Sequence, residues 1–220
     1  RHEAKMKEVK AGGAPVVFIG DSITHFWEGA GRSVWQKFFA EGPRRAINLG
    51  TSADRTEHVL WRLTEGGELD GYEAKCILLM IGTNNTGHRS RADETPVDTI
   101  IGVGEVIRRI RQKQPQAKII LHPIFPRGEK PTDEKRVRND IVNESIRQLA
   151  DGQTVFLCDF NDLLTETDGT LSKDIMPDFL HPNAKGQRIW VKAVLPVINR
   201  LLAKTDGDLP PAARSTGRRL

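Results

Sequence analysis

The chain has 220 residues, of which 38% are hydrophobic and 28% charged, and 33 lysines and arginines face 29 aspartates and glutamates. This composition is typical of a folded globular protein and excludes a chain that is disordered throughout. The longest apolar run, residues 76–81 (CILLMI), is far shorter than the roughly 20 residues that span a bilayer, and no basic run is interleaved with aromatics as in nucleic-acid-binding segments.

Short apolar runs alternate with longer segments of helical spacing along the chain. After an N-terminal helix within residues 1–14, strands are predicted at residues 16–20, 45–50, 75–82, 118–125 and 154–160. Helices are predicted at residues 54–67, 95–115, 132–150 and 183–204, and we expect Pro196 to kink or divide the last of them. Residues 205–220 are predicted to be a disordered polar tail.

This alternation predicts an α/β protein, in which a five-stranded parallel sheet is covered by helices on both faces, within one domain over residues 1–204. The helix over residues 95–115 should turn one apolar stripe inward: Val97, Ile100, Ile101, Gly104, Ile107 and Ile110. Cys76 and Cys158 each lie in a strand-like run, so we expect both to be free and buried, without a metal site.

Polar residues follow three of the predicted strands, at the edge where open parallel sheets carry their functional residues. The first strand leads into Asp21 and Ser22, the second into Gly50, and the third into Asn84. A serine at a strand–helix corner could be a nucleophile, with the Gly50 N–H and the Asn84 amide stabilising an oxyanion. Alternatively, Ser22 caps a helix, and Gly50 and Asn84 only form turns.

Asp178 and His181 lie three residues apart in a predicted loop before the final helix. Such a loop can present an imidazole that takes the serine proton together with the carboxylate that fixes its tautomer. A lone histidine in a loop is usually only solvated, so the combination with Ser22 carries the prediction.

Together, GDS, the glycine after the second strand, GTNN and DxxH resemble the four sequence blocks of the SGNH (GDSL) hydrolase family. Within that family the chain is similar to the platelet-activating factor acetylhydrolases of type Ib and to related bacterial esterases. The similar stretches are VVFIGDSI, DRTEHVLWRL, IGTNN, RQKQPQAKIIL, PRGEKP and DFLH. The resemblance implies a flavodoxin-like three-layer α/β/α sandwich and an enzyme that uses neither metal nor cofactor.

Carried over to this sequence, the family pattern makes Ser22 the nucleophile, His181 the general base and acid, and Asp178 the orienting carboxylate. The oxyanion hole would consist of the Ser22 and Gly50 backbone amides and the Asn84 side chain. One departure follows Gly50, because residues 51–53 read TSA where similar acetylhydrolases carry further glycines. We therefore expect a stiffer and bulkier loop beside the acyl pocket.

The sequence thus predicts a serine esterase that removes short acyl groups, most often acetyl, from an oxygen, with a carbohydrate O-acetylesterase favoured. The alternatives are a phospholipid acetylhydrolase, a general aryl or short-chain esterase, and, from another class, a non-catalytic flavodoxin-like binding module. Residues that could contact the substrate are Asp21, His25, Phe26, Trp27, Asn85 and the loop over residues 86–94. Phe26 and Trp27 could equally belong to the core.

The expected partner is a small acylated substrate, with no nucleic acid and no membrane span, and the resemblance suggests a homodimer. Because the chain begins with Arg1 rather than methionine, we expect that its native N-terminus is missing. A secreted or periplasmic location is favoured over a cytoplasmic one.

Overall fold

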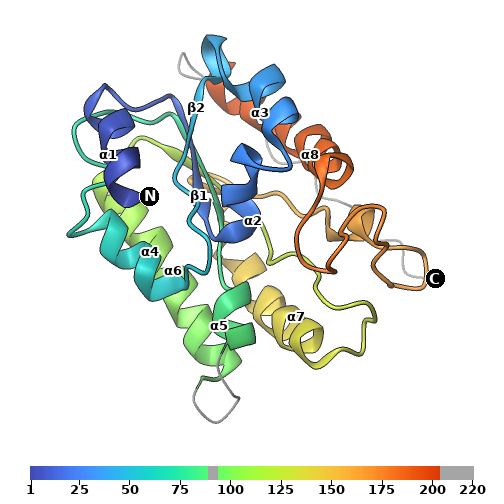
Figure 1. The fold of residues 1–220 in the computed structure, drawn as a ribbon. Coiled ribbons are helices and arrows are strands. Elements are labelled where there is room, and N and C mark those ends of the chain that lie inside the picture. Colours follow the sequence, from blue (N-terminus) through green and yellow to red (C-terminus); the bar gives the residue numbers. More distant parts are fainter. Residues whose placement is uncertain (89–93, 204–220) are drawn as a thin grey trace.

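The computed structural model describes residues 1–88 and 94–203. Five parallel strands form one sheet in the order β2-β1-β3-β4-β5 (Figure 1). Their bounds are β1 Val16–Gly20, β2 Ala46–Asn48, β3 Cys76–Met80, β4 Lys118–Leu121 and β5 Val155–Leu157. All five predicted strands are confirmed, and every residue of β1 and β3 is buried, as a parallel sheet covered on both faces requires.

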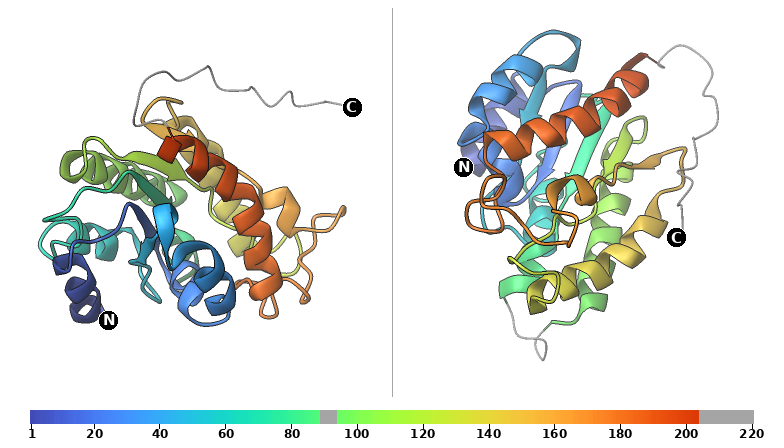
Figure 2. Two further views of the ribbon diagram at one scale, coloured as in Figure 1. Left: turned by 90° about the horizontal axis from the view of Figure 1, so that it is seen from above. Right: turned by 90° about the vertical axis from the view of Figure 1, so that its right-hand side faces the viewer.

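Helices cover both faces of the sheet, which gives the predicted α/β/α sandwich (Figure 2). One face is covered by α1 (His2–Lys10), α4 (Thr56–Leu63), α6 (Pro96–Lys113) and α7 (Glu134–Ile146), and the other by α2 (Ser22–His25), α3 (Arg32–Phe39) and α8 (Ala184–Ala203). The helix α5 (Thr83–His88) follows β3 directly. Short 3₁₀ helices complete the described part: η1 (Phe26–Glu28), η2 (Gly42–Arg44), η3 (Arg147–Leu149) and η4 (Asn161–Leu164).

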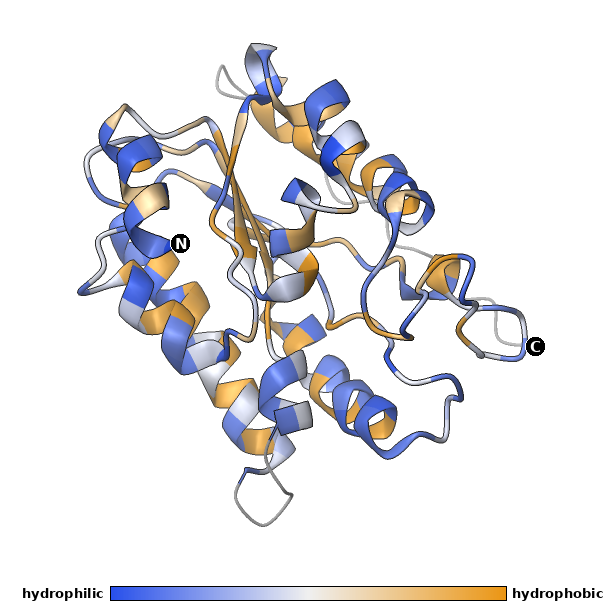
Figure 3. Cartoon of the chain, in the orientation of Figure 1, coloured by the Kyte–Doolittle hydropathy of each residue, from blue (hydrophilic) through white to orange (hydrophobic). Residues whose placement is uncertain are grey.

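Each face of the sheet has its own apolar core. The core under α4 and α6 is aliphatic, whereas the core under α3 and α8 is rich in aromatic side chains, with Phe18 of β1 in ring contact with Trp27, Trp35, Phe39 and Trp190. Figure 3 shows that the strands and the inward faces of the helices are hydrophobic, whereas the outward faces of the helices are hydrophilic. Two opposed cores hold the carboxyl ends of the strands in fixed positions.

Two predictions about the helices are wrong in detail. Val97 and Ile101 are 59% and 64% exposed, because Gly102 faces Thr56 of α4 so closely that an added Cβ would lie 2.4 Å from the Thr56 Oγ1. The buried face of α6 instead consists of Thr99, Val103, Val106, Ile107 and Ile110. Pro196 does not divide α8, which continues from Ala184 to Ala203 because buried side chains on both sides of the proline, including Val194 and Ile198, pack against the sheet. A kink at Pro196 stays a prediction.

Other predictions concern the strand ends, the cysteines and the C-terminus. β4 ends at Leu121, short of the predicted residue 125, since Pro123 has no N–H to continue the ladder. Cys76 and Cys158 are free and buried, as predicted. The predicted tail over residues 205–220 lies outside the described residues, so the domain bounds remain a prediction. None of the described helices combines the length and apolarity needed to cross a membrane.

Candidate active site

The corner between β1 and α2 holds Ser22 at the first helical position. Asp21 is the N-cap of α2, and its Oδ1 accepts a hydrogen bond of 2.9 Å from the Ile23 N–H. The alternative that Ser22 itself caps the helix is therefore wrong. The turn depends on Gly20, where an added Cβ would lie 2.4 Å from the Met80 carbonyl oxygen. Ser22 is 8% exposed, so it is held more tightly than an open surface serine.

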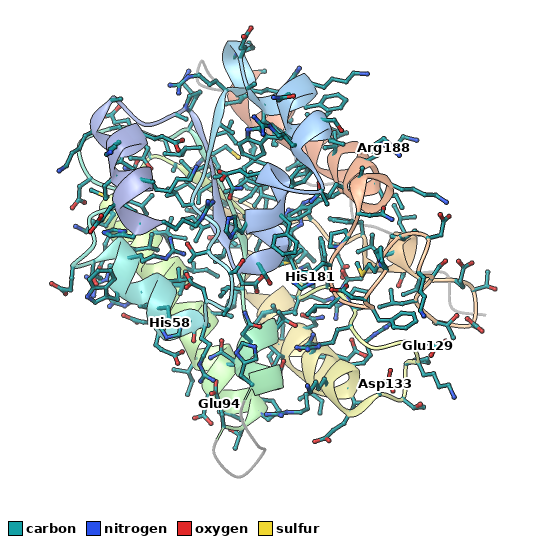
Figure 4. All side chains as sticks on the ribbon, in the orientation of Figure 1. His58, Glu94, Glu129, Asp133, His181 and Arg188 are labelled. Atoms are coloured by element: carbon teal, nitrogen blue, oxygen red, sulfur yellow. The ribbon has the colours of Figure 1, made fainter. Side chains whose placement is uncertain are left out.

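Ser22, His181 and Asp178 form one hydrogen-bonded chain. The Ser22 Oγ lies 2.8 Å from the His181 Nε2, across 159 positions of sequence. The His181 Nδ1 lies 2.6 Å from the Asp178 Oδ2, and the His181 backbone N–H donates to the Asp178 Oδ1 at 2.7 Å. A carboxylate on Nδ1 keeps the proton there, which leaves Nε2 free to accept the serine proton. His181 lies near the middle of the molecule in the view of Figure 4.

The Asp178 carboxylate remains charged at neutral pH. Partial burial alone would raise its pKa, but hydrogen bonds from the His181 ring and backbone hold the pKa of Asp178 below its ordinary value. Phe179, the next residue, has a φ of 56°, a left-handed conformation that a non-glycine residue rarely adopts. Its carbonyl accepts a hydrogen bond of 2.8 Å from the Gly128 N–H, which holds this tight loop in place.

Asn84 and Gly50 lie near the corner and are both engaged in hydrogen bonds. The Asn84 Nδ2 donates to the Asp54 carbonyl at 2.8 Å, which uses one of its two amide hydrogens. The Gly50 N–H donates to the Asn48 Oδ1 at 2.9 Å. It would have to leave or share this acceptor in order to bind an oxyanion. A Cβ at Gly50 would lie 2.6 Å from the His25 nitrogen, so this close approach requires glycine.

Three of the residues predicted to contact the substrate are buried and offer almost no surface to a ligand, so their contact with substrate stays a prediction that the structure does not support. Trp27 has no exposed surface and packs among the aromatic rings under α3 and α8, because η1 directs it toward Phe18 of the sheet. The Asn85 side chain is occupied by Thr56 and Glu94, with Nδ2 2.7 Å from the Glu94 Oε1. Asp21 is buried beneath the corner.

His25 and Phe26 remain at the edge of the site. The Phe26 ring is half-buried, with its centroid 4.7 Å from that of His181 at an interplanar angle of 34°. The His25 Nδ1 lies 2.8 Å from the Ser52 Oγ, so this ring faces the loop after Gly50. Contact of either ring with substrate remains a prediction. Of the loop over residues 86–94, residues 89–93 lie outside the described residues.

The buried carboxyl of Asp21 has an altered acidity. Burial raises the pKa of Asp21 to about 7; the Ile23 N–H opposes this rise, the Asp54 carboxylate adds to it, and the Arg127 guanidinium opposes it. The Asp21 Oδ2 has no hydrogen-bond partner within the described part of the chain. Asp21 therefore fixes the backbone of the corner and can carry a proton near neutral pH.

Sequence reasoning missed Arg127, which the resemblance touched only through the stretch PRGEKP. Its guanidinium donates to the Thr83 carbonyl at 2.8 Å, directly before Asn84. Arg127 also lines a cavity of about 460 Å³ beside the Asp178–His181 loop, together with Gly128, Asp133, Glu134, Lys135, Asp178, Phe179 and Leu180. Figure 4 labels Asp133 on the neighbouring segment. The cavity thus combines charged side chains with the apolar side chains of Phe179 and Leu180, and the triad residue Asp178 is part of its wall.

The described residues were predicted to hold no metal site. Within residues 1–88 and 94–203, no group of three or more histidine, cysteine, aspartate or glutamate side chains is arranged to hold a metal ion. The serine, imidazole and carboxylate already constitute the set that acyl transfer requires, namely a nucleophile, a base and an orienting group.

The chain is similar in sequence to known acylhydrolases. The sequence model of the GDSL-like Lipase/Acylhydrolase family matches residues 18–189. Platelet-activating factor acetylhydrolase IB subunit alpha1 of Homo sapiens is 34% identical over 197 residues, which are 89% of this chain and 80% of that protein. Subunit alpha2 of Rattus norvegicus is 35% identical over 193 residues, 86% of this chain and 78% of that protein.

Solved structures share the fold. A GDSL-like lipase from Bacteroides thetaiotaomicron superimposes with a TM-score of 0.73 at 18% identity, covering 91% of this chain and 98% of that one. An acetylxylan esterase from Geobacillus stearothermophilus superimposes with a TM-score of 0.63 at 18% identity, covering 87% and 94%. At these identities the likeness concerns the fold.

Proposed function

Because the chain belongs to the GDSL-like lipase/acylhydrolase family and is a carboxylic ester hydrolase, we propose that Ser22, His181 and Asp178 are its catalytic residues. The observation that carries this proposal is the continuous hydrogen-bonded chain from the Ser22 Oγ through the imidazole to the Asp178 carboxylate. A binding module would need no such chain, and the alternative of a non-catalytic protein is discarded.

The proposed reaction proceeds through an acyl-enzyme. The Ser22 Oγ attacks the ester carbonyl while its proton passes to the His181 Nε2, and Asp178 stabilises the resulting imidazolium. When the tetrahedral intermediate collapses, the bond to the alcohol oxygen breaks and the alcohol leaves with the proton from Nε2. Water then attacks the acyl-serine, gives its proton to the same nitrogen, and releases the carboxylic acid and the free Ser22 hydroxyl.

The negative charge that develops on the ester carbonyl oxygen must be stabilised by hydrogen-bond donors. We assign this role to the Ser22 backbone N–H, to the second Nδ2 hydrogen of Asn84, and to the Gly50 N–H once it leaves the Asn48 Oδ1. Removing one such donor costs on the order of 10² to 10³ in rate. Since the Asn84 amide is already fixed by the Asp54 carbonyl, it is ready to donate without reorganisation.

For the substrate we propose a short acyl ester, chiefly acetyl, on a carbohydrate. Acetylxylan esterases stand among the solved structures with the same fold. The half-buried Phe26 ring beside His181 offers an apolar face, and the cavity along Arg127 and Asp178 offers polar groups, a combination that suits a sugar. The second candidate is an acetylated phospholipid, which the 34% identity to the platelet-activating factor acetylhydrolase subunit favours.

The test is a panel of substrates scored for released acetate, with the Ser22→Ala variant as the matched control. The panel contains an acetylated xylooligosaccharide, a phospholipid with one acetyl ester, and p-nitrophenyl esters of increasing acyl length. The proposal predicts the highest kcat/KM for the acetylated sugar and none with Ser22→Ala. A higher kcat/KM for the phospholipid would favour the second candidate, and activity on the aryl esters alone would indicate a general esterase. The predicted homodimer is tested separately by light scattering.

A further inference from the structure

Arg62 of α4 is a buried arginine outside the proposed catalytic residues. Its side chain is 5% exposed and lies between two carboxylates, with Nε 2.8 Å from the Asp54 Oδ2 and Nη1 paired with Glu68. His2 holds the second Glu68 oxygen, with its Nδ1 2.7 Å away. Burying charges in this way rarely increases stability over an apolar core, so the arrangement suggests a role in fixing geometry.

The third contact of Arg62 is with the loop that carries Gly50. Its Nη1 donates to the Leu49 carbonyl at 2.8 Å. Because a trans peptide is planar and its C=O and N–H point in opposite directions, holding the Leu49 oxygen also fixes the direction of the Gly50 N–H. A guanidinium on the carbonyl further polarises this peptide and strengthens the N–H as a donor.

The second oxyanion donor is connected to the same guanidinium. Asp54, whose carboxylate Arg62 binds, accepts the Asn84 Nδ2 on its own backbone carbonyl at 2.8 Å. This hydrogen bond determines that the Asn84 side chain turns its amide nitrogen, rather than its oxygen, toward the Asp54 carbonyl. Ala53, directly before Asp54, has a φ of 66°, so the turn is strained and needs fixed neighbours.

We infer that Arg62 is a positioning residue that aligns both oxyanion donors, the Gly50 N–H through Leu49 and the Asn84 amide through Asp54. This inference rests on the proposed function, since it assigns Arg62 to the transition state of that reaction. Arg62 touches no reacting atom, and loss of its geometry should slow the chemical step more than it weakens substrate binding.

The experiment compares Arg62→Lys with Arg136→Lys, each alone and in an Asn84→Ala background. Arg136 is a matched control, because it is also a buried arginine that binds a backbone carbonyl, that of Gly169, but on α7 and away from the donors. Arg62→Lys should lower kcat about tenfold to 100-fold on p-nitrophenyl acetate, with KM changed less than about threefold. Arg136→Lys should leave kcat unchanged.

The double variant distinguishes an effect of Arg62 on the oxyanion donors from a general destabilisation of the fold. Because Arg62 is inferred to act on Asn84 as well as on Gly50, the part of its effect that passes through Asn84 should vanish once Asn84 is alanine. The loss caused by Arg62→Lys should therefore be smaller in the Asn84→Ala background than in the wild type. Equal losses in both backgrounds, or a kcat for Arg62→Lys within about threefold of wild type, would overturn the inference. Activity that persists in Ser22→Ala would instead overturn the proposed function.

Thermal unfolding of each variant shows whether it is folded. Should Arg62→Lys fail to fold, Asp54→Asn takes its place, since it keeps the carbonyl that binds Asn84 and weakens only the ion pair with Arg62. The expected loss in kcat is then about threefold to tenfold, and it should be smaller in the Asn84→Ala background. An unchanged kcat in a folded Asp54→Asn protein would equally contradict the inference.

Discussion

Replacing Asp21 with asparagine tests how the buried carboxyl of the β1–α2 corner ionises. Asparagine keeps an oxygen that can accept the Ile23 N–H, so the cap of α2 is preserved. The exchange removes only the ability to titrate. The perturbation is therefore isosteric and confined to a side chain that is buried in the wild-type protein.

The size of the effect follows from the difference between the folded pKa of Asp21, about 7, and its ordinary value of 3.8. Between these two pH values the folded protein holds a proton that the unfolded chain has released. The free energy of unfolding therefore falls as pH rises through this window, and it becomes level above about pH 7. At 1.36 kcal/mol per pKa unit, the part of this loss between pH 5 and pH 8 is about 3 kcal/mol.

Asp21→Asn lacks this loss, so its free energy of unfolding relative to wild type should increase by about 3 kcal/mol from pH 5 to pH 8. Urea unfolding at the two pH values measures this difference. Asp162→Asn, an exchange at an exposed aspartate of η4, serves as the control and should show no comparable change. A difference between Asp21→Asn and wild type that stays constant with pH would refute the reasoning.

Three further predictions concern the corner and the loop beside it. Asn84→Ala should lower kcat by about two to three decades in a protein that still folds, with a lower unfolding temperature because the buried Asp54 carbonyl loses its donor. A loss in kcat below tenfold would make Asn84 structural. Ala53→Gly should relieve the left-handed φ of 66° and raise the melting temperature by about 1–4 °C; a lower melting temperature would show that this strain is absent. Trp27→Ala should cost about 3–5 kcal/mol in urea unfolding, whereas a stable variant with only a raised KM would return Trp27 to the substrate site.

The strands and the order of the layers could be predicted because parallel strands buried on both faces read as short apolar runs. Because 159 positions separate Ser22 from His181, their pairing could be predicted only through the resemblance of several motifs to those of a known family. The pairing of Asp178 with His181 was easier to predict, because the two residues lie three positions apart in one short loop.

What the sequence could not predict depends on the direction of single side chains. A 3₁₀ helix of three residues such as η1 gives too few positions to show which face is buried. Phe26 and Trp27 therefore look alike in the sequence, although Trp27 lies in the core and Phe26 beside His181. Asn85 differs from Asn84 by one position, yet its amide is occupied by Glu94. The bond from the Gly50 N–H to Asn48 likewise has no sequence pattern.

The central claim is that Ser22 carries the acyl group during turnover. Rapid mixing of the protein with p-nitrophenyl acetate, followed by mass spectrometry of the quenched protein, measures this directly. The proposed mechanism predicts a burst of p-nitrophenol that approaches one equivalent per chain when deacylation limits turnover, with one acetyl group on Ser22, and neither signal in Ser22→Ala. An acetyl group on another residue, or full turnover by Ser22→Ala, would contradict the account.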